Sequence, residues 1–330
     1  MAKISVIGAG SWGMAVAWLL DGKGHTVKLW AFEPEIAEAI TSSGRNPVYL
    51  PKVQFSERTT ASSCMRTALE DAEAVVMVTP SIGVRATAEK MAETLPKDTP
   101  VVILSKGLEA GTHKVMTEIL EEVLGNPERI AALSGPNHAE EVSKAVPSAT
   151  VVAAHSPETA QYFQELFSTP FFRVYTNTDL VGVELCGAGK NVIAIACGMC
   201  DGMGLGDNAK ASLMTRGLAE LVRLGEAVGA RTDTFRGLAG MGDLIVTCTS
   251  KHSRNRSLGE GVARGDTLDG YQERTKMVVE GAVACNSIYE LARERGVDMP
   301  ITQLVYEVLY EGLSPEEGIG LLMSRPPKEE

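Results

Sequence analysis

The sequence predicts an α/β fold: a doubly wound, mostly parallel sheet followed by an all-α C-terminal domain. Two observations support this prediction. In the first half of the chain, short apolar runs alternate with helical stretches, which is the pattern of parallel strands joined by helical crossovers. From about residue 179 the strand patterns cease and helical stretches follow one another. We therefore expect two domains, residues 1–178 and residues 179–330, as the length of 330 residues also suggests.

The expected strands are short runs of apolar and β-branched residues, the composition of buried parallel strands. They are residues 3–7, 26–30, 74–79, 101–105, 130–134, 149–154 and 171–175. Helices are expected between several of them, over residues 14–20, 83–94, 111–124 and 157–168. In the second domain we expect helices over residues 180–200, 208–229, 255–265, 277–295 and 302–311, with turns at Pro300 and Pro315.

A glycine motif, Gly8-Ala9-Gly10-Ser11-Trp12-Gly13, stands at the first strand-to-helix turn. Gly8 permits the tight turn, Gly10 lets the backbone approach a pyrophosphate, and Gly13 permits close packing of helix and strand. The N–H groups of the helix N-terminus bind the phosphates. Because strand, helix and second strand fit within about 30 residues, the motif predicts a Rossmann-type dinucleotide-binding domain. The alternative is a glycine-rich turn without a ligand, since 33 glycines generate chance matches.

The end of the second strand does not decide between NAD and NADP. Glu33 lies 20 residues beyond Gly13, where a carboxylate would bind the ribose of NAD, but it also suits the first turn of a helix beside Pro34. The nearest cations for a 2′-phosphate are Lys28, inside the strand, and Arg45, in a loop that could fold back. We therefore expect both cofactors to be used.

Charge and hydropathy exclude several classes of protein. The formal net charge of −11 argues against general nucleic-acid binding, and an anionic substrate would need local basic residues. No apolar run reaches the roughly 18 residues of a membrane span. The N-terminus enters a strand directly, so we expect no secretory signal and a cytoplasmic protein.

Six scattered cysteines raise the question of a metal or redox site. Cys197-Gly198-Met199-Cys200 has zinc-ligand spacing, but no second ligand pair accompanies it. The flanking sequence reads as an apolar helix of small residues, so we expect buried free thiols and no metal.

Three places carry unusual polar residues. Lys106 follows an apolar strand and would reach the ligand edge of the sheet, although a solvated loop lysine is the alternative. Lys190 lies with Asn191 in the apolar stretch 185–200, where a buried ammonium would suit proton transfer; a lysine whose head reaches water is the alternative.

The third place is the run from Gly237 to Asn255. Asp243 stands in its glycine-rich turn, and the alternative for this residue is a helix N-cap. Ser253-Arg254-Asn255 offers a planar guanidinium and neutral donors, a combination that binds phosphate; a solvated loop that begins a helix is the alternative.

Together these segments resemble one family, the bacterial-type NAD(P)-dependent glycerol-3-phosphate dehydrogenases. The matching text covers nearly the whole chain in the family's order: residues 8–17, 106–109, 134–141, 184–221, 235–259 and 278–281. One departure is His138, where many members carry Phe.

The resemblance implies roles for individual residues. Lys190 corresponds to the family's proton acceptor, with Asp243 orienting its ammonium and Lys106 facing both cofactor and substrate. The implied cofactor contacts, besides Gly8, Gly10 and Gly13, are Ser11, Trp12, Phe32, Tyr49, Lys106, Ala139, Arg254, Val278 and Glu280. The implied substrate contacts are Lys106, Gly135, Asn137, Lys190, Asp243, Ser253, Arg254 and Asn255.

The implied reaction is reversible hydride transfer between NAD(P)H and carbon 2 of dihydroxyacetone phosphate, which supplies sn-glycerol 3-phosphate for phospholipid synthesis. The resemblance and the apolar helical domain also suggest a homodimer. Two other functions remain open. A β-hydroxyacid dehydrogenase also joins this nucleotide fold to helices and uses a lysine, but its substrates carry carboxylates. A nucleotide-sensing module without catalysis would need no buried lysine facing an aspartate.

Overall fold

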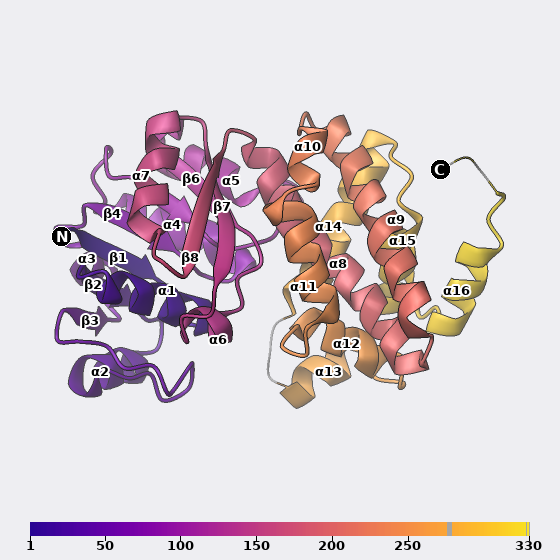
Figure 1. Ribbon diagram of the computed structural model, residues 1–330, viewed down its shortest axis with the longest axis horizontal. Helices are drawn as coiled ribbons and strands as arrows, with labels where there is room; N and C mark the ends of the chain where they lie inside the picture. Colours follow the sequence, from indigo (N-terminus) through magenta and orange to yellow (C-terminus); the bar gives the residue numbers. More distant parts are fainter. Residues whose placement is uncertain (276–278, 328, 330) are drawn as a thin grey trace. The chain divides into compact units, whose positions relative to one another are not determined.

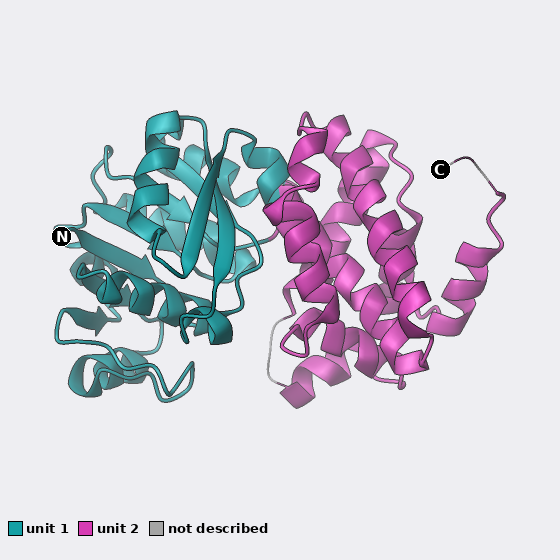
Figure 2. Ribbon diagram, in the orientation of Figure 1, with its two compact units in different colours: residues 1–106, 114–184 teal, residues 107–113, 185–330 magenta. Residues whose placement is uncertain are grey.

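The structure is a computed structural model that describes residues 1–275, 279–327 and 329. The chain divides into two units, coloured separately in Figure 2. The first consists of residues 1–106 and 114–184, and the second of residues 107–113 and 185–330. The segment 107–113 therefore leaves the first unit and returns to it.

The first unit contains an eight-stranded sheet in the order β3-β2-β1-β4-β5-β6-β7-β8 (Figure 1). Its strands are β1 (Lys3–Ile7), β2 (Thr26–Trp30), β3 (Thr59–Ser62), β4 (Ala74–Met77), β5 (Val101–Ile103), β6 (Ile130–Ser134), β7 (Ser148–Ala154) and β8 (Phe172–Asn177). All neighbours pair in parallel except β6 and β7, so the expected doubly wound, mostly parallel sheet is confirmed.

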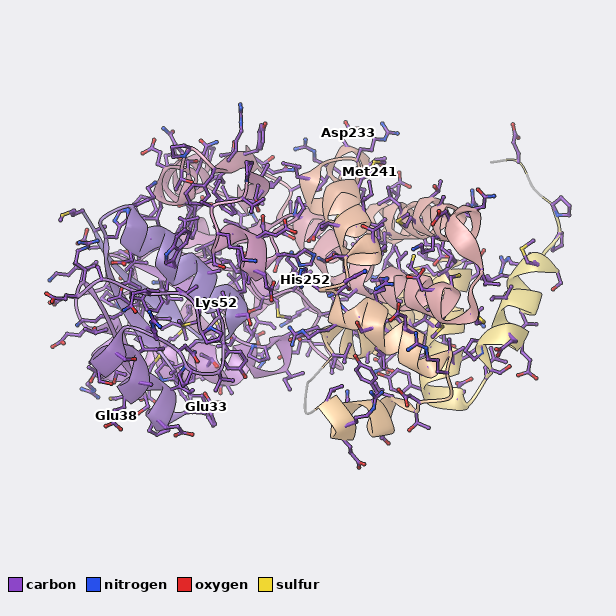
Figure 3. The ribbon with its side chains drawn as sticks, turned by 60° about the horizontal axis from the view of Figure 1, so that its bottom comes forward. Glu33, Glu38, Lys52, Asp233, Met241 and His252 are labelled. Carbon is purple, nitrogen blue, oxygen red and sulfur yellow. The ribbon has the colours of Figure 1, made fainter. Side chains whose placement is uncertain are left out.

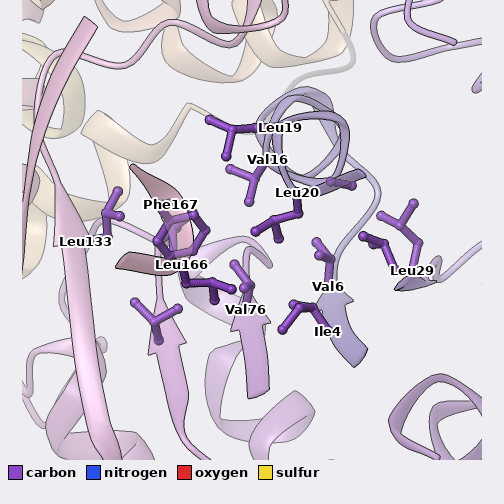
Figure 4. Packing of buried hydrophobic residues seen from close by; sticks show 14 of the residues in the cluster. Ile4, Val6, Val16, Leu19, Leu20, Leu29, Val76, Leu133, Leu166 and Phe167 are labelled. Atoms are coloured by element: carbon purple, nitrogen blue, oxygen red, sulfur yellow. The ribbon is translucent and has the colours of Figure 1, made fainter. Parts of the chain in front are cut away.

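Helices cover this sheet because its central strands are buried on both faces. They are α1 (Ser11–Gly22), α2 (Pro34–Ser43), α3 (Met65–Leu69), α4 (Val84–Ala92), α5 (Met116–Leu124), α6 (Ala139–Val142) and α7 (Pro157–Phe167), with short 3₁₀ turns at Ser81–Gly83 and Pro127–Arg129. Figure 4 shows Val6 and Val76 of the sheet in one buried apolar cluster with Leu20 of α1 and Phe167 of α7.

The order of the strands reverses beside β1. From β1 the chain moves outward through β2 and β3, and then returns to β4 on the other side of β1. In open α/β sheets, ligands bind outside the carboxyl ends of the strands at such a reversal. Gly8 and Val78 follow the two strands at this point.

In the second unit, every regular element of the described residues is a helix. Its elements are α8 (Leu180–Met203), which begins in the first unit, then α9 (Gly206–Ala227), α10 (Thr232–Phe235), a π-helix (Leu238–Gly242), α11 (Asp243–Thr249), α12 (Arg254–Val262), α13 (Leu268–Thr275), α14 (Glu280–Arg295), α15 (Pro300–Tyr306), a second π-helix (Glu307–Glu311) and α16 (Pro315–Met323). Among the described residues, only α8 is long and apolar enough to suit a membrane, but 94% of its most apolar window is buried in the protein, as in a core helix.

Two expected helices have different bounds in the structure, and one strand of the structure was not expected. The helix expected over 111–124 begins only at Met116, because Gly111 and His113 adopt φ values of +78° and +56°. The helix expected over 302–311 starts at Pro300 and passes into a π-helix after Tyr306. Strand β3 was not expected, since its sequence TTAS carries no apolar run. The start of the helix expected over 277–295 lies partly outside the described residues.

Candidate active site

The glycine turn of the first unit is built from backbone alone. Gly8 has a φ of +123°, which only glycine adopts readily, and its N–H donates to the carbonyl of Trp30 at 3.0 Å. A Cβ atom on Gly13 would lie 1.9 Å from the carbonyl oxygen of Gly8, so helix α1 can approach the strand only with glycine here. A Cβ on Gly10, the N-cap of α1, would meet nothing within 4 Å. The turn therefore presents open backbone at the N-terminus of α1, a geometry suited to a pyrophosphate.

Side chains around this turn are partly fixed by the protein. Trp12 packs beside Phe172, with ring centroids 6.5 Å apart, while Ser11 is the first residue of α1. Asn46, which the sequence analysis missed, donates from Nδ2 to the carbonyl of Ala9 at 3.0 Å and accepts from the N–H of Tyr49 at 3.0 Å. Asn46 thereby holds the loop that carries Tyr49 against the glycine turn.

The end of β2 presents an aromatic ring and few available charges. Phe32 is 72% exposed and could stack with a base. Glu33 is exposed as the N-cap of α2, but its side chain makes no capping bond (Figure 3). Lys28 donates to Glu70 at 3.1 Å, and Arg45 donates to Gln54 at 2.5 Å. Both cations thus already have partners, so the structure leaves the choice of cofactor as open as the sequence does.

At the carboxyl ends of β5 and β6, Lys106 donates to the carbonyl of Gly135 at 3.2 Å. Lys106 is half-buried, so its ammonium is held in part by the protein at this edge. The Asn137 amide nitrogen donates to Thr150 Oγ1 at 2.8 Å, and Thr150 donates to the carbonyl of Ser134 at 3.0 Å. These bonds fix the orientation of the Asn137 amide through its nitrogen and do not involve its Oδ1 atom.

Three oxygens near this edge of the sheet are buried and have no hydrogen-bond partner among the described residues: Thr79 Oγ1, Ser134 Oγ and Asn137 Oδ1. Buried polar atoms are normally paired, so these three oxygens could form hydrogen bonds with a polar ligand at this edge. The nearby Ala139 is the buried first residue of α6. Together with the open glycine turn, they fit a dinucleotide that lies along the carboxyl ends of the strands.

The second unit holds a buried ion pair between α8 and α11. Lys190 is only 7% exposed and Asp243 only 1%. The Nζ of Lys190 donates to Asp243 Oδ1 at 2.5 Å and to Thr247 Oγ1 at 2.8 Å. The alternative of a lysine with its head in water is therefore wrong. So is the N-cap alternative for Asp243, because Gly242 caps α11 and Asp243 is its first residue.

Thr247 accepts a hydrogen bond from the Lys190 ammonium and cannot donate to it. The sequence analysis missed this residue. It lies one turn after Asp243 on α11 and donates its own proton to the carbonyl of Asp243 at 2.6 Å. Its lone pairs are thus left for Lys190. The spacing of four residues was the only signal that could have found Thr247, and it is shared by many buried helical threonines.

The thiols of Cys248, near this pair, and of Cys200, further along α8, are buried. A hydrogen bond with Cys197, together with burial, raises the pKa of the Cys248 thiol well above its usual range. Burial raises the pKa of Cys200 to about 11. Thiols are nucleophiles and metal ligands as thiolates, so these environments suit small apolar side chains.

Ser253, Arg254 and Asn255 form the start of α12. Ser253 is its N-cap and accepts from the N–H of Arg256 at 3.2 Å, while Arg254 is exposed. Asn255 donates to Asn191 Oδ1 at 2.8 Å and accepts from the N–H of Gly281 at 2.9 Å. The start of α12 is thus tied to α8, one residue after Lys190, and to α14, one residue after Glu280.

These contacts bring together Lys190, Asp243, Ser253, Arg254 and Asn255 on neighbouring helices, with Glu280 at the start of α14. The cofactor contact expected at Val278 lies outside the described residues. An exposed guanidinium beside a helix N-terminus suits a phosphate, and a buried ammonium held by a carboxylate suits proton transfer.

Comparison with known proteins points to one family. The profile described as NAD-dependent glycerol-3-phosphate dehydrogenase N-terminus matches residues 3–160, and the corresponding C-terminus profile matches residues 179–320. Proteins named glycerol-3-phosphate dehydrogenase [NAD(P)+] are similar along the full length. The one from Moorella thermoacetica is 49% identical over 98% of this chain and 96% of its own, and the one from Corynebacterium glutamicum strain R is 47% identical over 100% of both.

Solved structures similar to this chain include members of the same family. The crystal structure of glycerol-3-phosphate dehydrogenase from Coxiella burnetii has a TM-score of 0.94 at 36% identity, and covers 98% of this chain and 99% of its own. D-mandelate dehydrogenase, with a TM-score of 0.63 at 14% identity over 96% of this chain and 99% of its own, shares the fold alone.

Proposed function

The chain belongs to the family of NAD-dependent glycerol-3-phosphate dehydrogenases, and from that premise we propose how its own residues carry out the reaction. The enzyme interconverts dihydroxyacetone phosphate and sn-glycerol 3-phosphate and uses NAD or NADP. A bound nicotinamide supplies the hydride for carbon 2 in the reducing direction and accepts it in the oxidising direction.

Lys190 transfers the proton. In the reducing direction its ammonium donates a proton to the carbonyl oxygen of the substrate, and in the oxidising direction the neutral amine takes the proton of the hydroxyl group. Asp243 and Thr247 hold the Nζ atom in place. The observation that carries this proposal is the burial of Lys190 together with its two bonds of 2.5 and 2.8 Å.

Arg254 binds the substrate phosphate with the N-terminus of α12, and Ser253 and Asn255 keep that turn in shape. Lys106, Gly135 and Asn137 contribute contacts from the first unit. The glycine turn from Gly8 to Gly13 holds the pyrophosphate of the cofactor, while Phe32 and Tyr49 lie beside its adenosine. The proposed set of cofactor contacts is completed by Ser11, Trp12, Lys106, Ala139, Arg254, Val278 and Glu280.

We also propose a cellular location, an oligomeric state and a metabolic role for the enzyme. It acts in the cytoplasm as a homodimer and supplies sn-glycerol 3-phosphate for phospholipid synthesis. Light scattering during gel filtration tests the dimer, since it gives the molar mass directly.

The activity is tested by following the absorbance of NADH and NADPH with dihydroxyacetone phosphate, and in parallel with a carboxylated 3-oxo acid. We expect rapid oxidation of NADH or NADPH with dihydroxyacetone phosphate only. Oxidation with the carboxylate alone would favour a β-hydroxyacid dehydrogenase. Bound cofactor without turnover of either substrate would favour a nucleotide-sensing module.

A further inference from the structure

Arg256 differs sharply from its near neighbour Arg254. Arg254 is exposed, whereas the Arg256 side chain is only 13% exposed and lies between two carboxylates. Its Nε donates to Asp201 Oδ2 at 2.6 Å, and its Nη2 donates to Glu260 Oε1 at 2.6 Å. A cation in the first turn of a helix opposes the helix dipole, so Arg256 needs these acids. With its charge neutralised, it is a poor ligand for a phosphate.

Asp201 is the centre of this cluster. Lys210 of α9 also binds it, with Nζ to Oδ1 at 2.8 Å. Burial alone would raise the pKa of Asp201. The hydrogen bonds and charges of Lys210 and Arg256 outweigh this effect, so the pKa of Asp201 is lowered. The carboxylate is thus ionised and bound on both oxygens. It joins the end of α8, the start of α9 and the first turn of α12.

Helices α8 and α12 touch through their backbones next to this cluster. A Cβ atom on Gly198 would lie 1.9 Å from the carbonyl oxygen of Arg256, and one on Gly259 would lie 2.0 Å from the carbonyl oxygen of Ile195. Such close packing leaves no room for sliding. Asn255 adds a bond to Asn191 at the other end of the contact.

Lys190 and Asp201 share one face of α8. They are eleven residues apart, which is close to three full helical turns of 3.6 residues. One helix thus carries the proposed proton donor and, about 16 Å along its axis, the carboxylate that holds α12.

We propose that Asp201 and Arg256 are positioning residues that lock the first turn of α12 onto α8, so that Arg254 meets the substrate phosphate at a fixed distance from Lys190. Asp201 acts through Arg256, and neither residue touches the substrate. The inference rests on the proposed function, because it takes the phosphate to bind at Arg254.

The test compares Asp201→Asn with Asp233→Asn. Asp233 forms an exposed ion pair with Arg236 in the same unit and is the matched control (Figure 3). For Asp201→Asn we expect the KM for dihydroxyacetone phosphate to rise on the order of tenfold, as loss of a charge-assisted bond allows. The KM for NADH should rise much less, because Arg254 is only one of many proposed cofactor contacts. Inhibition by inorganic phosphate should weaken in parallel with the rise in the substrate KM, and Asp233→Asn should change none of these values.

Two further variants exclude a merely structural effect. Arg256→Gln should raise the same KM. The double variant should raise it by clearly less than the product of the two single effects, because both single variants lose the bond between Asp201 and Arg256, although each also loses a bond of its own to Lys210 or Glu260. If Asp201→Asn unfolds, Asp201→Glu takes its place, since it keeps the charge but moves it by one methylene. Equal rises in the KM of substrate and NADH, or additive effects of the two variants, would overturn the proposal.

Arg254→Lys separates this inference from the proposed function. It keeps the charge but loses the planar fork, so the KM for dihydroxyacetone phosphate should rise clearly. If it does not, the phosphate binds elsewhere and the proposed function is wrong at this point. If Arg254→Lys raises the KM while neither Asp201 variant does, only the positioning role is wrong.

Discussion

The glycine turn of the first unit and the lysine cluster of the second are built in opposite ways. The turn uses six consecutive residues and presents backbone. The cluster uses side chains far apart in the sequence, since Asp243 and Thr247 follow Lys190 by 53 and 57 residues. The turn depends on the absence of side chains at its glycines, whereas the cluster depends on hydrogen bonds between polar side chains.

This contrast determines how each site is broken. A methyl group added at Gly8 or Gly13 damages the turn, because it would collide with the backbone of Val78 or of Gly8. Removal of a single partner damages the cluster, because a charge then remains buried without compensation. Each unit also contains a buried glutamate that accepts hydrogen bonds from the start of a neighbouring helix: Glu184 in the first unit and Glu220 in the second. The effects of these two glutamates on the pH dependence of stability can therefore be compared.

The largest effect is expected at Lys190. Lys190→Ala removes the proposed proton donor and should lower kcat by about 10²–10⁴, the usual contribution of a positioned acid or base. NADH affinity, measured by the fluorescence of bound NADH, should remain nearly normal.

Because this variant leaves Asp243 buried without its cation, its stability must be checked as well. Lys190→Met combined with Asp243→Asn removes both charges and serves as the control for folding. A folded variant with normal turnover would show that another group transfers the proton.

The buried carboxylates Glu184 and Glu220 should make stability depend on pH. Glu184 accepts from the N–H of Thr117 at 3.1 Å and from its hydroxyl, while Glu220 accepts from the N–H of Ile301 at 2.7 Å and from Thr302. Burial raises the pKa of Glu184 to about 8, with Glu118 and Glu121 adding to the shift. Burial raises the pKa of Glu220 to about 7, against the lowering effects of its hydrogen bonds and Arg223.

Between the unfolded pKa of about 4.5 and these raised values, the folded chain holds protons that the unfolded chain has lost. The free energy of unfolding should therefore fall as pH rises, by up to about 1.4 kcal/mol per pH unit for each group. Glu220→Gln should remove this slope up to pH of about 7, and Glu184→Gln up to about 8. Urea unfolding from pH 5 to 9 measures the slopes, and unchanged slopes in both variants would contradict the assignment.

Two glycines of the turn should separate stability from cofactor binding. Gly13→Ala forces a methyl group against the carbonyl of Gly8, so we expect unfolding to become easier by about 1–3 kcal/mol. Gly10→Ala meets no protein atom within 4 Å, so it should weaken NADH binding with little loss of stability. Thermal unfolding with and without NADH measures both effects. If Gly10→Ala binds NADH normally, the pyrophosphate does not lie over that residue.

The smallest effect is expected for the choice of cofactor. Glu33 makes no capping bond, and Lys28 and Arg45 are bound to Glu70 and Gln54. The ratio of kcat/KM for NADH and NADPH should therefore stay within about a hundredfold, which equals about 2.7 kcal/mol. Arg45→Gln should change the ratio only if Arg45 leaves Gln54 for the 2′-phosphate.

Local sequence patterns predict most strands of the first unit and its glycine turn. A strand, a glycine motif and a helix lie within 20 residues, and local backbone sterics fix the turn wherever the rest of the chain goes. The sequence also indicated that Lys190 is unusual, because an ammonium in an apolar helix requires a partner. The segment 111–115 was misjudged, because positive φ values at Gly111 and His113 interrupt a pattern that reads as helical.

Contacts between distant residues could be identified from the tertiary structure alone. It selected Asp243 and Thr247 as the partners of Lys190, joined Asn255 to Asn191, and separated Arg256 from Arg254 by pairing it with Asp201. It also showed Asn46 holding the loop of Tyr49 to the glycine turn. The physical reason is that these contacts depend on helix packing between distant segments, whereas sequence patterns report only local preferences and the face of each element that is buried.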